Sequence, residues 1–152
     1  METQIELVRT DSTHPQFLNL IRELDLYLAG VNGDDNPFFA QFNFVDTIRH
    51  VVLAFAEEKA VGCGAFKEFE HGVAEIKRMY VLPEMRGCHV GSRVLKEVES
   101  WASEEGFERS VLETAVTMLD ARRLYERNGY EVIPNYGPYV GKSQSVCMTK
   151  RF

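Results

Sequence analysis

The first half of the chain carries one helical pattern between strand patterns. Ile5 and Leu7 alternate with polar neighbours, which predicts a short strand. Apolar residues then recur at helical spacing after Thr13, the predicted N-cap, and Pro15, which suits a first turn. Apolar runs separated by tight turns predict an antiparallel meander, and the last of them ends before Pro83. The expected elements are a strand over 5–8, a helix over 15–28, a loop over 30–37, a short helix over 38–46, and strands over 51–56, 60–69 and 74–81.

The second half alternates between helices and strands. An apolar stripe from Val90 to Ala102 predicts a helix that ends before Gly106. Residues 117–120 resemble a weak capping box, which opens a second helix that runs through Asn128 and is stopped by Gly129, just past its end. Strands are expected over 110–113, 130–133 and 145–150. Because residues 74–113 form a strand, a helix and a strand, they predict a β-α-β crossover with one parallel pair.

These elements together predict the fold class. It is α/β (α+β), with a mixed and mostly antiparallel sheet of six to seven strands flanked by about four helices. Nothing in the chain is typical of a linker or a repeat, so residues 1–152 are expected to form one domain.

Composition and charge exclude several classes of protein. Hydrophobic residues make up 45% of the 152 residues and charged residues 26%, as in ordinary globular domains. The net charge of −6 argues against nucleic acid as a partner. The longest apolar run is far shorter than a membrane span, and the N-terminus lacks a secretory pattern, so no membrane partner is expected. The three cysteines show no C-x-x-C pair and the four histidines no metal-ligand spacing. We therefore expect reduced thiols, a cytoplasmic location and no metal site.

The segment from Arg86 to Ser92 carries the most informative local signal. It contains Gly87 and Gly91 and lies between a strand end and a helix start. Glycine lets a ligand approach the backbone, and the first N–H groups of a helix, which lack internal partners, attract anions. Arg86 adds a charged fork, so a phosphate or pyrophosphate is the expected ligand. The nucleotide motifs G-x-x-x-x-G-K-[ST] and G-x-G-x-x-G are absent. A glycine-rich turn that merely starts a helix explains these residues equally well.

Two blocks of the second half resemble the GNAT N-acetyltransferase family. Residues 86–91 resemble the pattern Q/R-x-x-G-x-G/A of the family's acetyl-CoA loop except at His89, and residues 121–130 match A-x-x-L-Y-x-x-x-G-F/Y. The strand over 74–83 is also similar to the one that precedes this loop in the family. The resemblance implies a GNAT-like fold whose crossover carries the pyrophosphate loop, with acetyl-CoA as cosubstrate and no metal. The cofactor-binding residues that it implies are Met79, Tyr80, Val81, Arg86, Gly87, Cys88, His89, Val90, Gly91 and Ser92.

Four positions in and around these blocks bear on how the cosubstrate would be bound. By the resemblance, backbone groups of Met79 and Val81 pair with the pantetheine arm of the cosubstrate like an added strand. His89 replaces the central glycine of the family loop, so its side chain either narrows the space beside the pyrophosphate or contacts a phosphate. Met118 replaces an asparagine that many members carry three residues before Ala121, so any cofactor contact from that asparagine is missing.

The resemblance also implies two catalytic residues. Tyr125 stands where the family places the acid that protonates the departing thiolate; the alternative is a core tyrosine with a satisfied hydroxyl. Glu75 has the spacing of a general base that takes the proton of the attacking amine. Its alternative role is an ion pair with Lys77, which lies on the same strand face. Cys88 lies near a helix N-terminus and could act as a nucleophile, but a loop residue without that role is favoured.

The family resemblance places substrate specificity in residues 28–43 and 135–143. Acidic and aromatic residues there, Asp34, Asp35 and Phe39 among them, would suit a small cationic substrate, although a solvated loop explains each of them singly. The predicted function is transfer of an acetyl group from acetyl-CoA to a primary amine of a small molecule or peptide, by direct attack in a ternary complex. The alternatives are a module that binds or senses acyl-CoA without catalysis, and a protein-interaction domain. Homodimers are frequent in such families, but no segment of the sequence specifies one.

Overall fold

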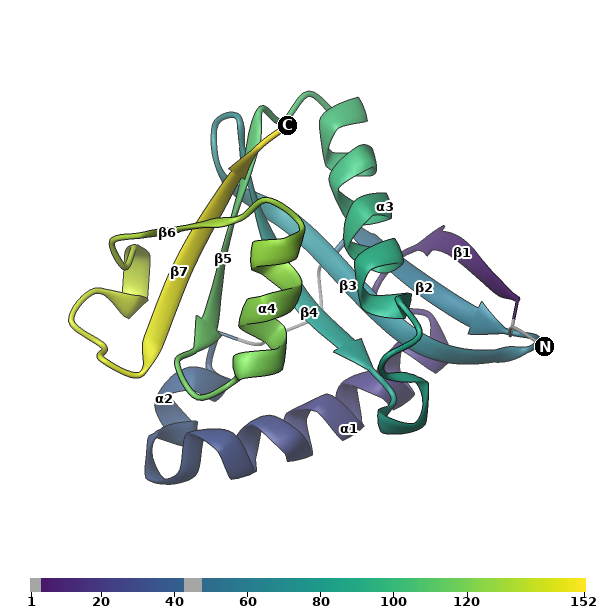
Figure 1. Ribbon diagram of the computed structural model, residues 1–152, viewed down its shortest axis with the longest axis horizontal. Coiled ribbons are helices and arrows are strands. Elements are labelled where there is room, and N and C mark those ends of the chain that lie inside the picture. The colour runs from purple at the N-terminus through teal and green to yellow at the C-terminus, as the bar shows by residue number, and fades with distance from the viewer. Residues whose placement is uncertain (1–3, 43–47) are drawn as a thin grey trace.

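The computed structural model describes residues 4–42 and 48–152, which form a seven-stranded sheet with helices on both faces (Figure 1). The helices are α1 (Pro15–Asn32), α2 (Asn36–Ala40), α3 (Val90–Glu104) and α4 (Leu119–Arg127). The strands are β1 (Ile5–Thr10), β2 (His50–Ala56), β3 (Lys59–Glu70), β4 (Val73–Val81), β5 (Arg109–Ala115), β6 (Glu131–Ile133) and β7 (Ser145–Arg151). Three short 3-10 helices complete the described elements: η1 (Gly33–Asp35), η2 (Pro83–Met85) and η3 (Gly137–Tyr139). The predicted fold class is confirmed.

The sheet has the order β1-β2-β3-β4-β5-β7-β6 and contains one parallel pair. β4 and β5 are parallel because α3 crosses over between them, whereas every other neighbouring pair is antiparallel. The parallel pairing covers only three residues of β4, Val73–Glu75. Beyond it the two strands diverge, and α4 lies in front of the gap in Figure 1. The fold therefore opens the sheet at its centre, at the carboxyl ends of β4 and β5.

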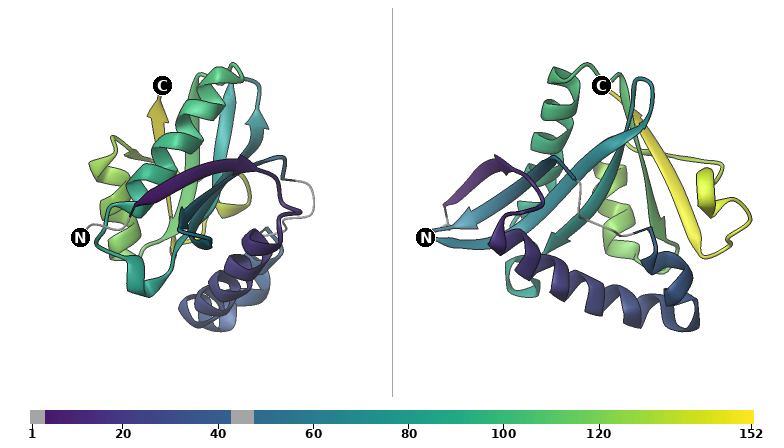
Figure 2. Two further views of the ribbon diagram at one scale, coloured as in Figure 1. Left: turned by 90° about the vertical axis from the view of Figure 1, so that its right-hand side faces the viewer. Right: turned by 180° about the vertical axis from the view of Figure 1, so that it is seen from behind.

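The two faces of the sheet carry different helices. α3 and α4 lie on one face, and α1 and α2 lie on the other (Figure 2). α3 approaches β3 so closely that a Cβ atom at Gly64 would overlap the Met79 sulfur and lie 2.9 Å from a methyl carbon of Val94. Glycine is thus required in β3 for this packing. Buried residues from both faces, Phe17, Leu53 and others, form one main core.

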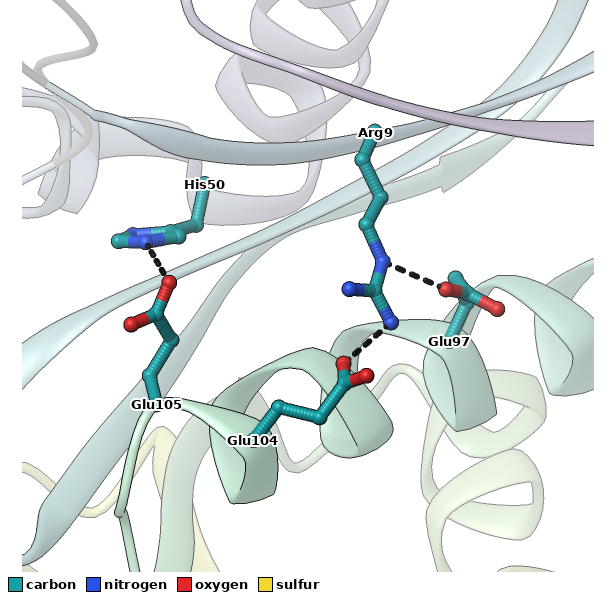
Figure 3. Close-up of polar contacts among 5 residues, drawn as sticks. All are labelled: Arg9, His50, Glu97, Glu104 and Glu105. Atoms are coloured by element: carbon teal, nitrogen blue, oxygen red, sulfur yellow. Dashed lines mark hydrogen bonds and ion pairs between the residues drawn. The ribbon is translucent and has the colours of Figure 1, made fainter.

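Polar contacts also fix α3 against the β1–β2 edge of the sheet (Figure 3). The Arg9 guanidinium reaches Glu97 at 2.7 Å and Glu104 at 2.6 Å and lies over the Trp101 ring. Because these side chains are partly exposed, each ion pair contributes at most about 1 kcal/mol. They link β1 to the C-terminal half of α3.

The segment after α1 differs from the sequence prediction. The prediction of a loop over 30–37 is wrong, because α1 continues to Asn32 and is followed directly by η1 and α2. Pro37 suggested a loop, but it occupies the first turn of α2, where a missing N–H costs nothing. The helix predicted over 38–46 corresponds in part to α2, while residues 43–46 of that prediction, and Asn43 of the first specificity segment, lie outside the described residues.

Two predicted helix caps are also wrong. α1 is capped by His14, whose Nδ1 accepts a hydrogen bond from the Gln16 backbone, and not by Thr13. Thr13 instead bonds to Asp11 within the preceding turn. The capping box over 117–120 is not formed, since Met118 is the N-cap of α4 and makes no capping bond. Among the described residues, no helix is long and apolar enough to cross a membrane.

Candidate active site

A cavity of about 120 Å³ lies in the gap between β4 and β5. Residues 75–79 of β4 and 113–115 of β5 form its strand walls, Tyr125 of α4 lines it on the α4 side, and Leu24 and Leu28 of α1 line it from the other face. Pairing between β4 and β5 has ended at this level, so their facing edges offer N–H and C=O groups to an extended ligand.

A bulge in β4 shapes this cavity. Between Cys63 and Ala65 the register advances three residues on β4 for two on β3. Arg78 in this stretch has φ 60°, in the left-handed region. Its guanidinium is almost fully buried and contacts the Asp25 carboxylate at 2.6 Å. Bulges re-aim side chains, and here Lys77 and Arg78 both contribute to the cavity lining.

The β4 residues predicted to contact a cofactor lie between the cavity and the loop over 86–92, which we call the anion loop. Met79 lines the cavity. Tyr80 is buried, and the Arg86 guanidinium lies 5.7 Å from its ring centre. The Val81 carbonyl accepts a hydrogen bond of 3.1 Å from Nε of Arg86. Pairing of that carbonyl with a pantetheine arm would therefore require Arg86 to release it.

The loop before α3 has the backbone shape of an anion site. Gly87 has φ 81° and His89 has φ 65°, and α3 begins at Val90, where no side chain of the described residues caps its first N–H groups. A left-handed residue costs little only when it is glycine, which explains why the family pattern has glycine where His89 stands. Cys88 in the same loop is exposed. The uncapped N–H groups and the helix dipole fit a pyrophosphate.

The start of α3 is tied to the end of α4. The Asn128 side-chain amide donates to Ser92 Oγ at 3.2 Å and to the Leu124 carbonyl at 2.8 Å. Gly91 faces Leu124, whose nearest side-chain carbon would lie 3.3 Å from a Cβ atom at this position. These contacts place the loop over 86–92 next to the block over 121–130.

Tyr125 is buried, and it lines the cavity. Its hydroxyl makes no hydrogen bond to any other residue in the described ranges. Burial, and to a smaller extent the nearby Glu113 carboxylate, raise the pKa of Tyr125 well above the usual range of a phenol. The phenol thus holds its proton at neutral pH and can donate it as a hydrogen bond.

Glu75 lies in the cavity lining, and both of its carboxylate oxygens are engaged. Oε1 is 3.6 Å from Nζ of Lys77, and Oε2 accepts a hydrogen bond of 2.8 Å from the Tyr136 hydroxyl. The ion pair that the sequence offered as the alternative to a base is therefore present. Burial lowers the pKa of Lys77, against the opposing effect of Glu75.

Glu113 is a cavity residue that the sequence reasoning missed. It stands on β5, two residues beyond Val111, the partner of Glu75 in the parallel pairing, so both carboxylates face the same side of the sheet. Oε2 of Glu113 accepts a hydrogen bond of 2.7 Å from the Ser145 hydroxyl. Burial raises the pKa of Glu113 above its ordinary value. The available signal was a glutamate directly after the apolar pair Val111 and Leu112, at the end of the strand predicted over 110–113.

Both segments predicted to set substrate specificity reach the cavity. Leu28 and Phe39 line it from the first segment and Tyr139 from the second. The Phe39 and Tyr139 rings are stacked with their centres 6.5 Å apart. The aspartates of the first segment are not part of the lining, and Asp35 instead accepts a hydrogen bond from Gln144. The chamber is thus aromatic and aliphatic on this side, and its acidic groups come from β4 and β5.

Comparison with known proteins agrees with this geometry. A model of the Acetyltransferase (GNAT) family matches residues 16–130. The chain is 31% identical to an IAA acetyltransferase of Azospirillum brasilense, across 96% of this chain and 97% of that protein.

Solved structures show the same fold. A Klebsiella pneumoniae protein described as a candidate acyl-CoA N-acyltransferase superposes with a TM-score of 0.81 at 29% identity, over 99% of both chains. The PaiA N-acetyltransferase of Thermoplasma acidophilum, solved in complex with coenzyme A, has a TM-score of 0.74 at 19% identity, over 98% of this chain and 99% of that one. With the family model spanning both sequence blocks, the central gap and the anion loop, this chain belongs to the GNAT family of acetyltransferases.

Proposed function

We propose that this protein is an N-acyltransferase that moves the acetyl group of acetyl-CoA to a primary amine of a small molecule or peptide, by direct attack in a ternary complex. The observation that carries the proposal is the cavity between β4 and β5, which is lined by the phenols of Tyr125 and Tyr139 and by two carboxylates and lies on the strand that leads to the N-terminus of α3. We take residues 1–152 as one acetyltransferase domain. The three free cysteines support a cytoplasmic location.

In this proposal the chain binds acetyl-CoA at two places. The N–H groups at the start of α3 and the Arg86 guanidinium hold the pyrophosphate. The free edge of β4 around Met79 pairs with the pantetheine arm and brings the thioester into the cavity. Held in this way, the thioester and the amine meet without the entropy cost of a free encounter.

Two protons must move during the transfer. Tyr125 donates its proton to the departing sulfur, because it lines the cavity and its raised pKa keeps the phenol protonated at neutral pH until a thiolate develops beside it. A carboxylate must take a proton from the amine, because an alkyl ammonium, with a pKa of about 10, does not attack. Glu75 and Glu113 are the two carboxylates in the cavity that could accept it.

The proposal is tested by amine-dependent release of the coenzyme A thiol from acetyl-CoA, detected with a thiol reagent. Small alkylamines, arylalkylamines, amino acids and lysine peptides form the panel, and mass spectrometry identifies the acetylated product. We expect release above the rate of hydrolysis with at least one class of primary amine. Tight binding of acetyl-CoA without amine-dependent release for any class would instead support the non-catalytic binding module.

A further inference from the structure

We propose that Glu113 binds the ammonium group of the acceptor and accepts its proton. This inference rests on the proposed function and names the residue that performs one of its steps. Glu113 lines the cavity beside Thr114 and Ala115, on the strand that faces β4 across the gap. It therefore lies opposite the strand edge along which the thioester arm would run.

The hydrogen bonds of Glu113 leave one of its oxygens available. Oε2 accepts the proton of the Ser145 hydroxyl at 2.7 Å. Ser145 is itself buried, at the start of β7, where its position is fixed by pairing with Ala115. Oε1 makes no hydrogen bond with any residue of the described ranges. The carboxylate is thus held in one orientation with one oxygen free.

Unlike Glu113, Glu75 has no free carboxylate oxygen. Lys77 neutralises its charge at 3.6 Å, and the Tyr136 hydroxyl occupies its second oxygen. Glu75 and Lys77 together carry no net charge, and Arg78 is likewise paired with Asp25 outside the strand walls. Among the described charged residues that line the cavity, Glu113 is the one without an ion-pair partner, and a cationic ammonium group would balance its negative charge.

The groups that face Glu113 come from four elements. They are Glu75 and Lys77 of β4, Ser145 of β7, Tyr139 of η3 and Tyr125 of α4. Burial raises the pKa of Glu113 most, and Glu75 adds to the increase, while the Ser145 bond and Lys77 oppose it. A carboxyl with a raised pKa is a better proton acceptor near neutral pH.

Glu113 and Tyr125 are also coupled. The negative charge of Glu113 contributes to the raised pKa of Tyr125. Once Glu113 has accepted a proton, that contribution disappears and Tyr125 becomes a stronger proton donor.

The step balances in atoms and protons. Glu113 Oε1 takes one proton from the ammonium, and the resulting amine forms a C–N bond with the acetyl carbon as the C–S bond breaks. The sulfur leaves with the proton of Tyr125, and the second proton on nitrogen passes to the Tyr125 oxygen. Glu113 returns its proton to water when the amide leaves.

The test compares Glu113→Gln with Glu75→Gln in acetyl transfer to two amines of nearly equal size. Ethylamine is an ammonium ion at pH 7, whereas the electron-withdrawing fluorines of 2,2,2-trifluoroethylamine leave it largely neutral. We expect Glu113→Gln to lower kcat/KM for ethylamine by about 100-fold at pH 7, the scale of general-base catalysis. The loss should be much smaller for trifluoroethylamine and should shrink for ethylamine as the pH rises.

The pH profile distinguishes the two carboxylates. In the unmodified enzyme kcat/KM should rise with pH through the pKa of Glu113, at a pH above the ordinary value of 4.5 for a glutamate. Glu113→Gln should lose this rise, and Glu75→Gln should keep it. Ser145→Ala should move the rise to higher pH, because the Ser145 bond lowers the pKa of Glu113. A profile lost in Glu75→Gln but kept in Glu113→Gln would overturn the proposal.

A binding measurement makes the proposal testable even if neither amine is acetylated. Ethylamine hydrochloride is titrated into the protein carrying carbon-13 in its glutamate carboxyl groups, with resonances assigned from the two glutamine variants. We expect the Glu113 carboxyl signal to shift and the Glu75 signal to change little. No shift of Glu113 would contradict the inference, whereas absence of acetyl transfer to the whole amine panel would contradict the proposed function.

Discussion

Replacing Tyr125 by phenylalanine is expected to lower kcat by about 100-fold or more, the scale of general-acid catalysis. The Tyr125 hydroxyl lines the cavity and makes no hydrogen bond within the described ranges, so its removal leaves no buried partner unsatisfied. The dissociation constant of acetyl-CoA should change by no more than about twofold, because the phenol acts only when the C–S bond breaks. Steady-state kinetics and calorimetry measure the two quantities separately.

Tyr130→Phe is the matched control for this substitution. The Tyr130 ring packs edge-on against Tyr125, with ring centres 5.8 Å apart, and its hydroxyl bonds to Ser110 at 2.7 Å. Its loss should lower the free energy of unfolding by about 1 kcal/mol through that buried bond, with little effect on kcat. If Tyr125→Phe retained the kcat of the unmodified enzyme, Tyr125 would have no part in the proton transfer.

Replacing Gly91 by aspartate is expected to weaken acetyl-CoA binding by about 100-fold, or about 2.7 kcal/mol. Gly91 lies in the first turn of α3, where the pyrophosphate is proposed to bind, and a carboxylate there would repel it. The fold itself should tolerate the change, since a negative charge is favourable at a helix N-terminus. Calorimetric titration and chemical denaturation measure the affinity and the free energy of unfolding.

Gly91→Asn separates charge from size at the same position. Either side chain would meet Leu124 and Val81, whose side chains lie 3.3 Å and 3.7 Å from the Cβ position. The asparagine variant should therefore show the steric part of the loss alone, and we expect it to bind several-fold more tightly than the aspartate variant. Equal affinities for the two variants would argue against an anion at the start of α3.

Much of the fold follows from patterns within short segments. The alternation along β1, the apolar runs of β2 to β4 and the stripe on α3 predict their elements within a few residues. The crossover between β4 and β5 predicts the parallel pair because a right-handed connection leaves few other arrangements. The course of the chain after Asn32 was predicted wrongly, because Pro37 is compatible with both a loop and a helix start.

Less of the candidate site than of the fold could be predicted from the sequence. Motifs predicted the loop from Arg86 to Ser92 and singled out Tyr125 and Glu75. Tyr125 and Glu75 line one cavity, and the loop lies between β4 and α3. Glu113 had no motif, and its relation to the cavity depends on the place where β4 and β5 stop pairing. The end of this pairing at Glu75 and Val111 is a relation between two strands far apart in the sequence, which no local pattern reports.

The central claim is that the loop before α3 holds the pyrophosphate of acetyl-CoA. It is tested most directly by calorimetric titration of the purified protein with acetyl-CoA and, in parallel, with S-acetylpantetheine, which carries the same thioester without the pyrophosphate. We predict tight binding of acetyl-CoA and far weaker binding of S-acetylpantetheine. Equal affinities would place recognition on the β4 edge alone, and no binding of either compound would contradict the account.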